Sequence, residues 1–426
     1  MAGTITDLLL RFFQQGVPED AAEMMRLSLF DWAACGIAGA REEEFTEFTQ
    51  TQQAPSRGAN LVIGGGTACA PTAALINGTL SHALDYDDTH FAHIGHPSVA
   101  VIPAVLALAE DIGADVETLV DAATIGVEAS ILVGLWLGRD HYQVGYHQTA
   151  TAGAFGATLG TCRLLDLDAE TTRMALGLCA SMASGLKAQF GTMAKPLNAG
   201  LAARTGVEAA LWAQAGMTAT QDGLAGPLGF GPTHFGMEGQ VTLPKRSWNI
   251  LSISHKFHAC CHGLHAMLEA LGQAKLAAQE LEALHIRTHP RWMSVCNIEN
   301  PKTGLAAKFS YRQTAAMCLL GHATNAIENF TDEITQDPAV AAQRGKIRVS
   351  ADAALTETQA ELSATLKGGA IRRFKHDLLA PMVIEKRARK LREKAAALIS
   401  AERAEALWGA VQGNELRALR QVLAGT

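Results

Sequence analysis

The stretch PSVAVIPAVLALAEDIGADVETLVDAATIGVEASILVGLWL, residues 97–137, carries the clearest fold signal in the chain. Its apolar residues recur at helical spacing, without the alternation typical of strands. We predict one helix over 97–112 and a second over 115–137, with Gly113 closing the first. Small residues recur along both, which lets neighbouring helices pack at short separation inside a broad core.

The same Ala-, Leu- and Gly-rich texture extends from the N-terminus to about Gly239, where nearly all of the chain should be helical. After Lys245 the pattern changes to short β-like pieces at 284–288, 346–350 and 361–366. From about Val383 the pattern is helical again and rich in charge. We therefore predict a large helical domain and a smaller α+β domain.

Composition excludes several classes of function. The 426 residues hold 35 Lys and Arg against 42 Asp and Glu, a net charge of -7, so no basic field exists for nucleic acid or an anionic membrane. The apolar runs at 97–109 and 174–186 are too short to span a bilayer, and no signal-peptide pattern follows the N-terminus. We expect a cytoplasmic protein.

Cofactor motifs are also missing from the sequence. The eight cysteines include no CxxC pair, which favours reduced thiols over a disulfide framework or a zinc site. No GxGxxG, GxxxxGK[ST] or GxSxG motif occurs, so a nucleotide cofactor has no visible cradle and a serine hydrolase no visible nucleophile. We expect no cofactor and no metal.

Residues 77–103, NGTLSHALDYDDTHFAHIGHPSVAVIP, hold an unusual density of ionisable groups between two apolar helices. Three interpretations stay open for them. His90, His93 and His96, spaced by three, could bind a metal with a nearby aspartate. The loop could instead cap helices through Asp88 or Thr89, with solvated histidines. We favour the third, a cofactor-free acid/base site where carboxylate, hydroxyl and imidazole groups converge on a small polar substrate.

Three further segments favour the acid/base interpretation. His147 precedes a Gly- and Ala-rich helix whose first N–H groups could bind a carboxylate. Lys195 stands alone in an uncharged stretch of small residues, so it needs an anionic partner or a depressed pKa. Lys256, in HKFHACCH at the expected domain boundary, could be a second anion-binding cation.

The quoted loop, with YHQTATAGAFGAT, SGLKAQFGTMAKPLNAG, HKFHACCHGLHA and KFSYRQTAA, resembles the MmgE/PrpD family over nearly the whole chain. Members of this family dehydrate, decarboxylate or epimerise small acids such as 2-methylcitrate, cis-aconitate and iminodisuccinate. The resemblance implies an all-helical domain of residues 1–245 plus 385–426 and an inserted α+β lid of residues 246–384. It also implies a homodimer with a metal-free active site in the cleft between the two domains.

The same resemblance implies the residues of the site. It assigns catalysis to Asp85, His96, His147, Lys195 and Lys256, and substrate binding to Thr89 and Tyr311. We count His90 and His93, from the same loop, with the substrate-binding residues, although the sequence leaves open whether they are part of the site or its neighbours. The lysines would pair with carboxylates, the two histidines would serve as general base and acid in undecided order, Asp85 would orient one of them, and Thr89 would hydrogen-bond the substrate. The sequence departs from the family pattern at three places. One extra residue lies between Thr89 and His96, His258 stands where proline is common, and the segment 372–381 matches poorly.

The expected function is a cofactor-independent lyase that dehydrates or decarboxylates a di- or tricarboxylate. An epimerase of a dicarboxylate such as iminodisuccinate is the first alternative. A carboxylate-binding protein without catalysis is the second, although a binder would need the lysines but not the acid/base pair.

Overall fold

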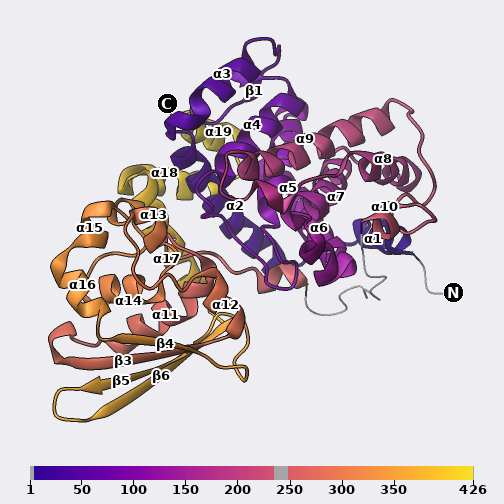
Figure 1. The fold of residues 1–426 in the computed structure, drawn as a ribbon. Helices are drawn as coiled ribbons and strands as arrows, with labels where there is room; N and C mark the ends of the chain where they lie inside the picture. The colour runs from indigo at the N-terminus through magenta and orange to yellow at the C-terminus, as the bar shows by residue number, and fades with distance from the viewer. Residues whose placement is uncertain (1–3, 235–247, 426) are drawn as a thin grey trace. The chain divides into compact units, whose positions relative to one another are not determined.

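The computed structural model describes residues 4–234 and 248–425 (Figure 1). The chain divides into two compact units, Met1–His255 with Ile399–Thr426, and Lys256–Leu398. The first unit is almost entirely helical, and the second combines helices with a four-stranded sheet. The expected fold class, mainly α with a smaller α+β part, is confirmed.

The first unit contains twelve described α-helices and one two-stranded ribbon. The helices are α1 (Ile5–Phe13), α2 (Glu19–Gly39), α3 (Thr46–Gln53), α4 (Ala70–His82), α5 (Ser98–Ile112), α6 (Val116–Val144), α7 (Gln148–Leu164), α8 (Ala169–Met182), α9 (Ala194–Gln214), α10 (Phe230–Thr233), α18 (Ala401–Gln412) and α19 (Leu416–Ala424). The ribbon pairs β1 (Asn60–Leu61) with β2 (Thr67–Ala68). Helices α4 to α9 lie together and form most of this unit (Figure 1).

The two helices predicted from residues 97–137 are α5 and α6. Gly113 closes α5 in the left-handed conformation, with φ 64°, and the Asp115 carboxylate caps α6 by accepting from the N–H of Thr118 at 2.8 Å. The helical pattern ends at Leu137 because Gly138 leaves helical geometry, with φ 71° and ψ -175°. The chain then resumes helical turns as far as Val144.

Helix α6 is long and apolar. Among the described residues it alone combines the length and composition of a membrane span, with a mean hydropathy of 1.6 over 18 residues. The structure buries 83% of that window inside the unit. This burial is what the central helix of a globular domain requires.

Glycines set the closest helix contacts of the first unit. A Cβ added at Gly78 of α4 would lie 2.9 Å from the Cα of Gly200 in α9, and one added at Gly200 would overlap the carbonyl oxygen of Leu75. Because neither residue has a side chain, the two backbones touch. The C-terminal end of α4 and the N-terminal end of α9 are thereby held close together.

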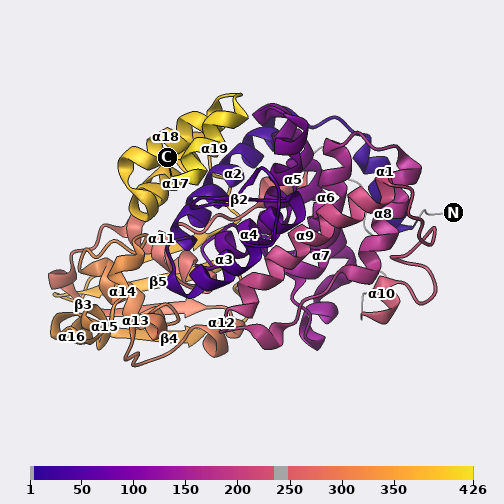
Figure 2. The ribbon, with the colours of Figure 1, turned by 90° about the horizontal axis from the view of Figure 1, so that it is seen from above.

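The C-terminal helices α18 and α19 complete the first unit, as Figure 2 shows beside α2. Trp408 packs edge-on against Phe30 of α2, with ring centroids 5.2 Å apart. The guanidinium of Arg26 donates to the carbonyl of Val411 at 2.7 Å. Two segments more than 350 residues apart in sequence therefore share one core.

The second unit is a sheet with helices on one face. Its strands are β3 (Leu281–Thr288), β4 (Ile347–Ala351), β5 (Gln359–Leu366) and β6 (Ile371–Asp377), in the order β4-β3-β5-β6 with only β3 and β4 parallel. Its α-helices are α11 (His265–Ala274), α12 (Pro290–Val295), α13 (Gly304–Ala307), α14 (Tyr311–Leu319), α15 (Asp332–Gln336), α16 (Pro338–Arg344) and α17 (Ile384–Ile399). The alternating buried residues of β3 and β5 face this helical layer.

Three of the four strands of this sheet match the β-like pieces of the sequence. The fourth, β6, was not predicted, because its sequence IRRFKHD carries charge at most positions and offers no apolar alternation. As an edge strand it pairs only with β5, and its mostly exposed charged side chains suit that place. Strand β6 therefore forms because it pairs with β5, and not because of its local sequence pattern.

The limits of the units differ from the predicted domain limits. The first predicted boundary, at residues 245 and 246, lies outside the described residues. The second, at 384 and 385, coincides with the start of α17, yet the structure assigns 385–398 to the second unit. Contacts that join α17 to this unit include the Lys390 ammonium, which pairs with the Glu269 carboxylate of α11 at 2.5 Å and lies 4.7 Å from the centroid of the Phe257 ring.

The crossing of α4 and α9 makes a stability prediction. We expect Gly200→Ala to lower the free energy of unfolding by about 1–3 kcal/mol or more, because the methyl group has no space. Gly409→Ala is the control: it lies in helix α18 with nothing within 4 Å of the added Cβ, so it should raise stability by about 0.5–1 kcal/mol. Urea unfolding measures both, and equal effects would contradict the steric account.

Candidate active site

The candidate site forms where four chain segments of the first unit meet. These are the last residue of α4, the loop 83–97, the residue before α7, and the first turns of α9. The loop leaves α4 through Asp85, which adopts the left-handed conformation with φ 49°. Aspartate tolerates this conformation better than most residues, and the turn brings the loop back over the helix end.

A buried carboxylate organises the inner half of the site. The two oxygens of Asp87 lie 2.9 Å from Nδ1 of His82 and 2.9 Å from Nδ1 of His96. An ionised carboxylate only accepts hydrogen bonds, so His82 donates its Nδ1 proton to Asp87, whereas Nδ1 of His96 faces the other oxygen at ion-pair distance without the geometry of a hydrogen bond. The two rings meet edge-on with centroids 4.6 Å apart. The second nitrogen of His96 faces the outer half of the site.

A lysine and a second aspartate form the outer half. Oδ1 of Asp85 accepts from the Lys195 ammonium at 2.7 Å and lies 3.2 Å from Nε2 of His96. The Asp85 side chain is 47% exposed, against 2% for Asp87. The cluster thus runs from a buried carboxylate, through an imidazole, to a carboxylate and an ammonium that solvent reaches.

His147 lies beside this cluster at the N-cap of α7. Its ring is nearly parallel to that of His82, with centroids 6.0 Å apart, and meets Phe190 edge-on at 5.0 Å. Its Nδ1 lies 3.2 Å from the side-chain amide nitrogen of Asn198 in α9. The backbone N–H of His147 donates to Gly185 at 3.0 Å, which fixes the start of the helix.

Burial controls protonation in this region. Burial lowers the pKa of His82 to about 4, despite the opposing effect of Asp87. Burial also lowers the pKa of His147 well below its usual value, and the nearby charges of His82, Lys195 and His96 lower it further. For Asp87, burial alone would raise the pKa, but His82 and His96 hold it well below the usual range. At neutral pH the site therefore combines the buried Asp87 anion with neutral imidazoles at His82 and His147.

The other predicted loop residues have mainly backbone partners. The hydroxyl and N–H of Thr89 both donate to the carbonyl of Ser254, at 3.2 and 3.0 Å. Nδ1 of His90 accepts from the N–H of His93, whose own Nε2 lies 3.2 Å from the Ser130 hydroxyl. Both histidines are buried, so the alternative of a loop with solvated histidines is wrong.

The remaining two predicted residues belong to the second unit. Lys256 is its first residue. Tyr311 is buried, donates its hydroxyl proton to the carbonyl of Gly263 at 2.6 Å and lies 2.8 Å from the hydroxyl of Thr288. Their roles beside Asp85 and Lys195 stay predictions from the sequence.

One group among the described residues has the composition of a metal site. His82, Asp85, Asp87 and His96 each offer a ligand atom within 4.8 Å of the others. This set differs from the His90, His93 and His96 set considered above. The Lys195 ammonium already supplies a cation 2.7 Å from Asp85, and a divalent ion there would be repelled by it. The donor set therefore fits a network of ion pairs better than a metal.

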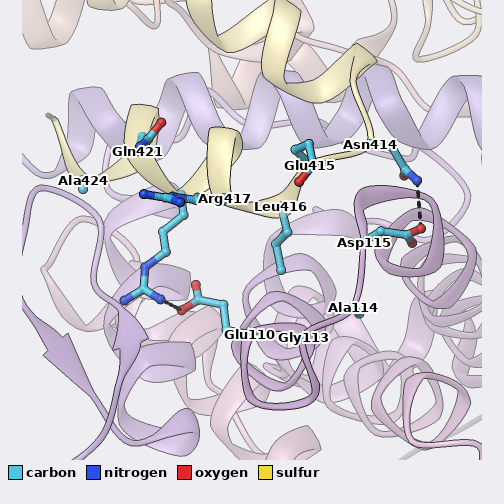
Figure 3. Close-up of a pocket in the computed structure, with 11 residues that line it drawn as sticks. Glu110, Gly113, Ala114, Asp115, Asn414, Glu415, Leu416, Arg417, Gln421 and Ala424 are labelled. Atoms are coloured by element: carbon cyan, nitrogen blue, oxygen red, sulfur yellow. Dashed lines mark hydrogen bonds and ion pairs between the residues drawn. The ribbon is translucent and has the colours of Figure 1, made fainter.

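A separate cavity of about 720 Å³ lies between α19 and the junction of α5 with α6 (Figure 3). Arg420 pairs there with Glu110 at 3.5 Å, and Asn414 donates to Asp115 at 2.8 Å. No histidine lines this cavity. Its paired charges join the C-terminal helix to the helical core, a structural role.

The sequence prediction missed three residues of the site: His82, Asp87 and Asn198. His82 and Asp87 were counted in the dense loop but given no role, because spacing alone does not show which aspartate faces which imidazole. Asn198 stands three residues after Lys195, one helical turn away, and this spacing was the only available signal.

Comparisons with known proteins match both parts of the chain to one family. The MmgE/PrpD N-terminal domain matches residues 4–241 and the MmgE/PrpD C-terminal domain matches residues 258–415. The cis-aconitate decarboxylase of Aspergillus terreus is 30% identical over 286 residues, 62% of this chain and 58% of that protein. The cis-aconitate decarboxylase of Homo sapiens is 29% identical over 233 residues, 52% of this chain and 48% of that protein. The matches thus span about half the length of these relatives.

The buried neutral histidines predict an acid-sensitive fold. The pKa of His90 is lowered to about 4 and that of His93 to about 3, both mainly by burial. Between pH 6.5 and 4 the unfolded chain binds protons that the folded chain does not, so the free energy of unfolding should fall as the pH falls. Each such histidine contributes about 1.4 kcal/mol per pH unit within this window.

Urea unfolding at a series of pH values tests this linkage. In His93→Gln the free energy of unfolding should depend less steeply on pH, by an amount that corresponds to the uptake of up to one proton fewer on unfolding. A wild-type stability that stays constant from pH 7 to pH 5 would contradict the linkage.

Proposed function

Because the chain belongs to the MmgE/PrpD family, we propose that it is a lyase acting on a small polycarboxylate related to cis-aconitate. Its similarity to proteins named cis-aconitate decarboxylases favours decarboxylation over dehydration. The proposal includes no cofactor and no metal, and it places the enzyme in the cytoplasm.

The observation that carries the proposal is the contact of the Lys195 ammonium and Nε2 of His96 with one oxygen of Asp85. Chemistry at the carbon beside a carboxylate needs two groups. One is a cation that pairs with the carboxylate, and the other is an imidazole that exchanges protons. Here they share one partner at the exposed end of the cluster. A substrate carboxylate can take the place of Asp85 as the anion that Lys195 binds.

In the decarboxylation that we propose, the bond between carbon and the departing carboxylate breaks and CO₂ leaves. The bonding electron pair delocalises over the remaining unsaturated acid, where Lys195 stabilises the negative charge. His96, protonated on both nitrogens, then donates its Nε2 proton to carbon and becomes neutral, and a solvent proton that arrives through exposed Asp85 restores the charge. Asp87 holds Nδ1 throughout and stabilises the protonated ring, as a buried aspartate does for a catalytic histidine.

Dehydration would use the same groups in another order. His96 would remove the proton beside a carboxylate, and the hydroxyl group would leave as water with a proton supplied by a second donor such as His147. Lys256, Tyr311 and Thr89 would complete the binding of the other carboxylates. His90 and His93 would support the loop that carries His96.

We also propose that the protein is a homodimer. The exposed apolar side chains of Leu201 and Trp212 lie eleven residues apart, three helical turns, on the outer face of α9. Phe190 and Met193, just before this helix, are also exposed. A second copy of the chain could bury this surface beside the site.

A panel of substrates tests the reaction. Proton NMR in D₂O would follow the chelator-treated enzyme with cis-aconitate, 2-methylcitrate, citrate and iminodisuccinate. We expect a smaller unsaturated acid carrying one solvent deuterium from cis-aconitate. Vinylic signals from a saturated acid would favour dehydration instead, and deuterium exchange without elimination would favour an epimerase. No change in any substrate would contradict the proposed catalysis.

Matched lysine variants test the role of the cation. Lys195→Gln should lower kcat/KM by about 10²- to 10³-fold, because it removes the charge that stabilises the intermediate. Lys187→Gln is the control, since its ammonium donates to the carbonyl of Tyr142 at 2.9 Å and stacks on that ring. Similar losses in both variants would contradict a specific role for Lys195.

The dimer is tested by its mass in solution. Light scattering should give twice the chain mass for the wild type and a monomer for the double variant Leu201→Glu and Trp212→Glu. Leu228→Glu, at an exposed leucine elsewhere on the first unit, should leave the dimer intact. A monomeric wild type at micromolar concentration would exclude the dimer.

A further inference from the structure

Asn198 makes a contact whose direction determines how His147 can act. Its side-chain amide lies in the first turns of α9, 93% buried, one turn after Lys195. The amide nitrogen is 3.2 Å from Nδ1 of His147 and 3.4 Å from the carbonyl oxygen of Leu186. Asn198 and His147 stand 51 positions apart, so the sequence did not indicate that they are in contact.

The second of these contacts fixes the orientation of the amide. The oxygen and nitrogen of an asparagine side chain can be exchanged by rotation, so one contact alone leaves the direction open. A carbonyl oxygen only accepts, so the group that faces Leu186 is the NH₂ group. The same NH₂ group faces His147, and its second proton points to the imidazole. Nδ1 of His147 is therefore an acceptor without a proton of its own.

We propose that Asn198 is a positioning residue that holds His147 as a neutral imidazole with its proton on Nε2, which makes His147 the fixed hydrogen-bond donor of the site. A neutral imidazole has one N–H and one acceptor nitrogen, and Asn198 occupies the acceptor. Nε2–H is then the group left for a substrate oxygen. The kinetic part of this inference rests on the proposed lyase function, whereas the tautomer does not.

The opposite arrangement surrounds His96. A carboxylate oxygen of Asp87 lies 2.9 Å from Nδ1 of His96, whereas the amide NH₂ of Asn198 lies 3.2 Å from Nδ1 of His147. Partners of opposite polarity thus assign opposite roles: His96 exchanges protons through Nε2, and His147 donates a hydrogen bond without changing its charge. The proposal therefore gives proton transfer to His96 and leaves His147 a hydrogen-bonding role.

The charged surroundings of His147 also favour its neutral form. His82 on α4, Lys195 on α9 and His96 in the loop all disfavour a positive charge on it, and only Asp85 favours one. Burial acts in the same direction and lowers its pKa most. A neutral donor avoids the cost of placing another cation beside Lys195.

Long-range ¹H–¹⁵N correlation NMR of the resting enzyme tests the tautomer without any substrate. The full chain would carry ¹⁵N only in its 15 histidines, and loss of one set of signals in His147→Gln would assign them. We expect the pattern of a neutral ring protonated at Nε2 at pH 7.5. A ring protonated at Nδ1, or a doubly protonated ring, would overturn the proposal.

Two substitutions at Asn198 test the consequence. In Asn198→Asp the carboxylate accepts from Nδ1, so the proton pattern of His147 should switch, and kcat should fall by about 10²-fold. The acidic limb of the kcat profile should move to higher pH, because a carboxylate beside Nδ1 stabilises the imidazolium. Asn198→Ser keeps a small polar group and should give a mixture of tautomers with an intermediate kcat.

Asn77→Asp is the matched control. Asn77 is also buried and also donates to a backbone carbonyl, that of Leu61 at 2.8 Å. The Asn77→Asp variant should be less stable than the wild type, while its His147 NMR signals and the pH profile of its kcat stay as in the wild type. If Asn198→Asp lowers stability but leaves the His147 pattern unchanged, Asn198 is only structural and the proposal fails. A switched pattern without activity on any substrate would instead reject the lyase function and keep the tautomer.

Discussion

The structure of the site depends on one steric constraint, the backbone contact between α4 and α9 at Gly78 and Gly200. Any side chain at either position would separate the two helices. His82 lies about one turn beyond the crossing on α4, and Asn198 and Lys195 lie within two turns of it on α9. The constraint thus brings an imidazole, an amide and an ammonium from distant parts of the sequence to the ends of two helices, where the loop 83–97 meets them.

The second determinant is the cost of burying Asp87. An ionised carboxylate removed from water costs several kcal/mol unless hydrogen bonds compensate for it. Here a hydrogen bond from His82 and an ion-pair contact with His96 supply that compensation, and both contacts position the two rings. The same interaction that stabilises the anion therefore orients the proton-exchanging group. A site built in this way needs little reorganisation when substrate arrives.

The sequence predicted the fold well where local pattern determines structure. Helices α5 and α6 followed from periodicity and from the signals at Gly113 and Asp115, and three strands of the sheet followed from their β-like composition. Strand β6 did not, because an edge strand with charged side chains carries no apolar alternation and forms only when β5 offers its hydrogen bonds. The assignment of α17 to the second unit likewise rests on long-range contacts, among them the ion pair of Lys390 with Glu269 of α11.

For the site, the sequence by itself determined which chemical groups are available: the carboxylates and imidazoles of the loop, His147, and a lysine without local partners. Residue type and local composition suffice for that, because charged groups in apolar surroundings need compensation. Only the tertiary structure decided how these groups pair. Asp87 rather than Asp85 faces Nδ1 of His96, and Asn198 rather than a carboxylate faces His147. The physical reason is that the helix crossing and the loop conformation bring together residues far apart in the chain and so fix which donor meets which acceptor.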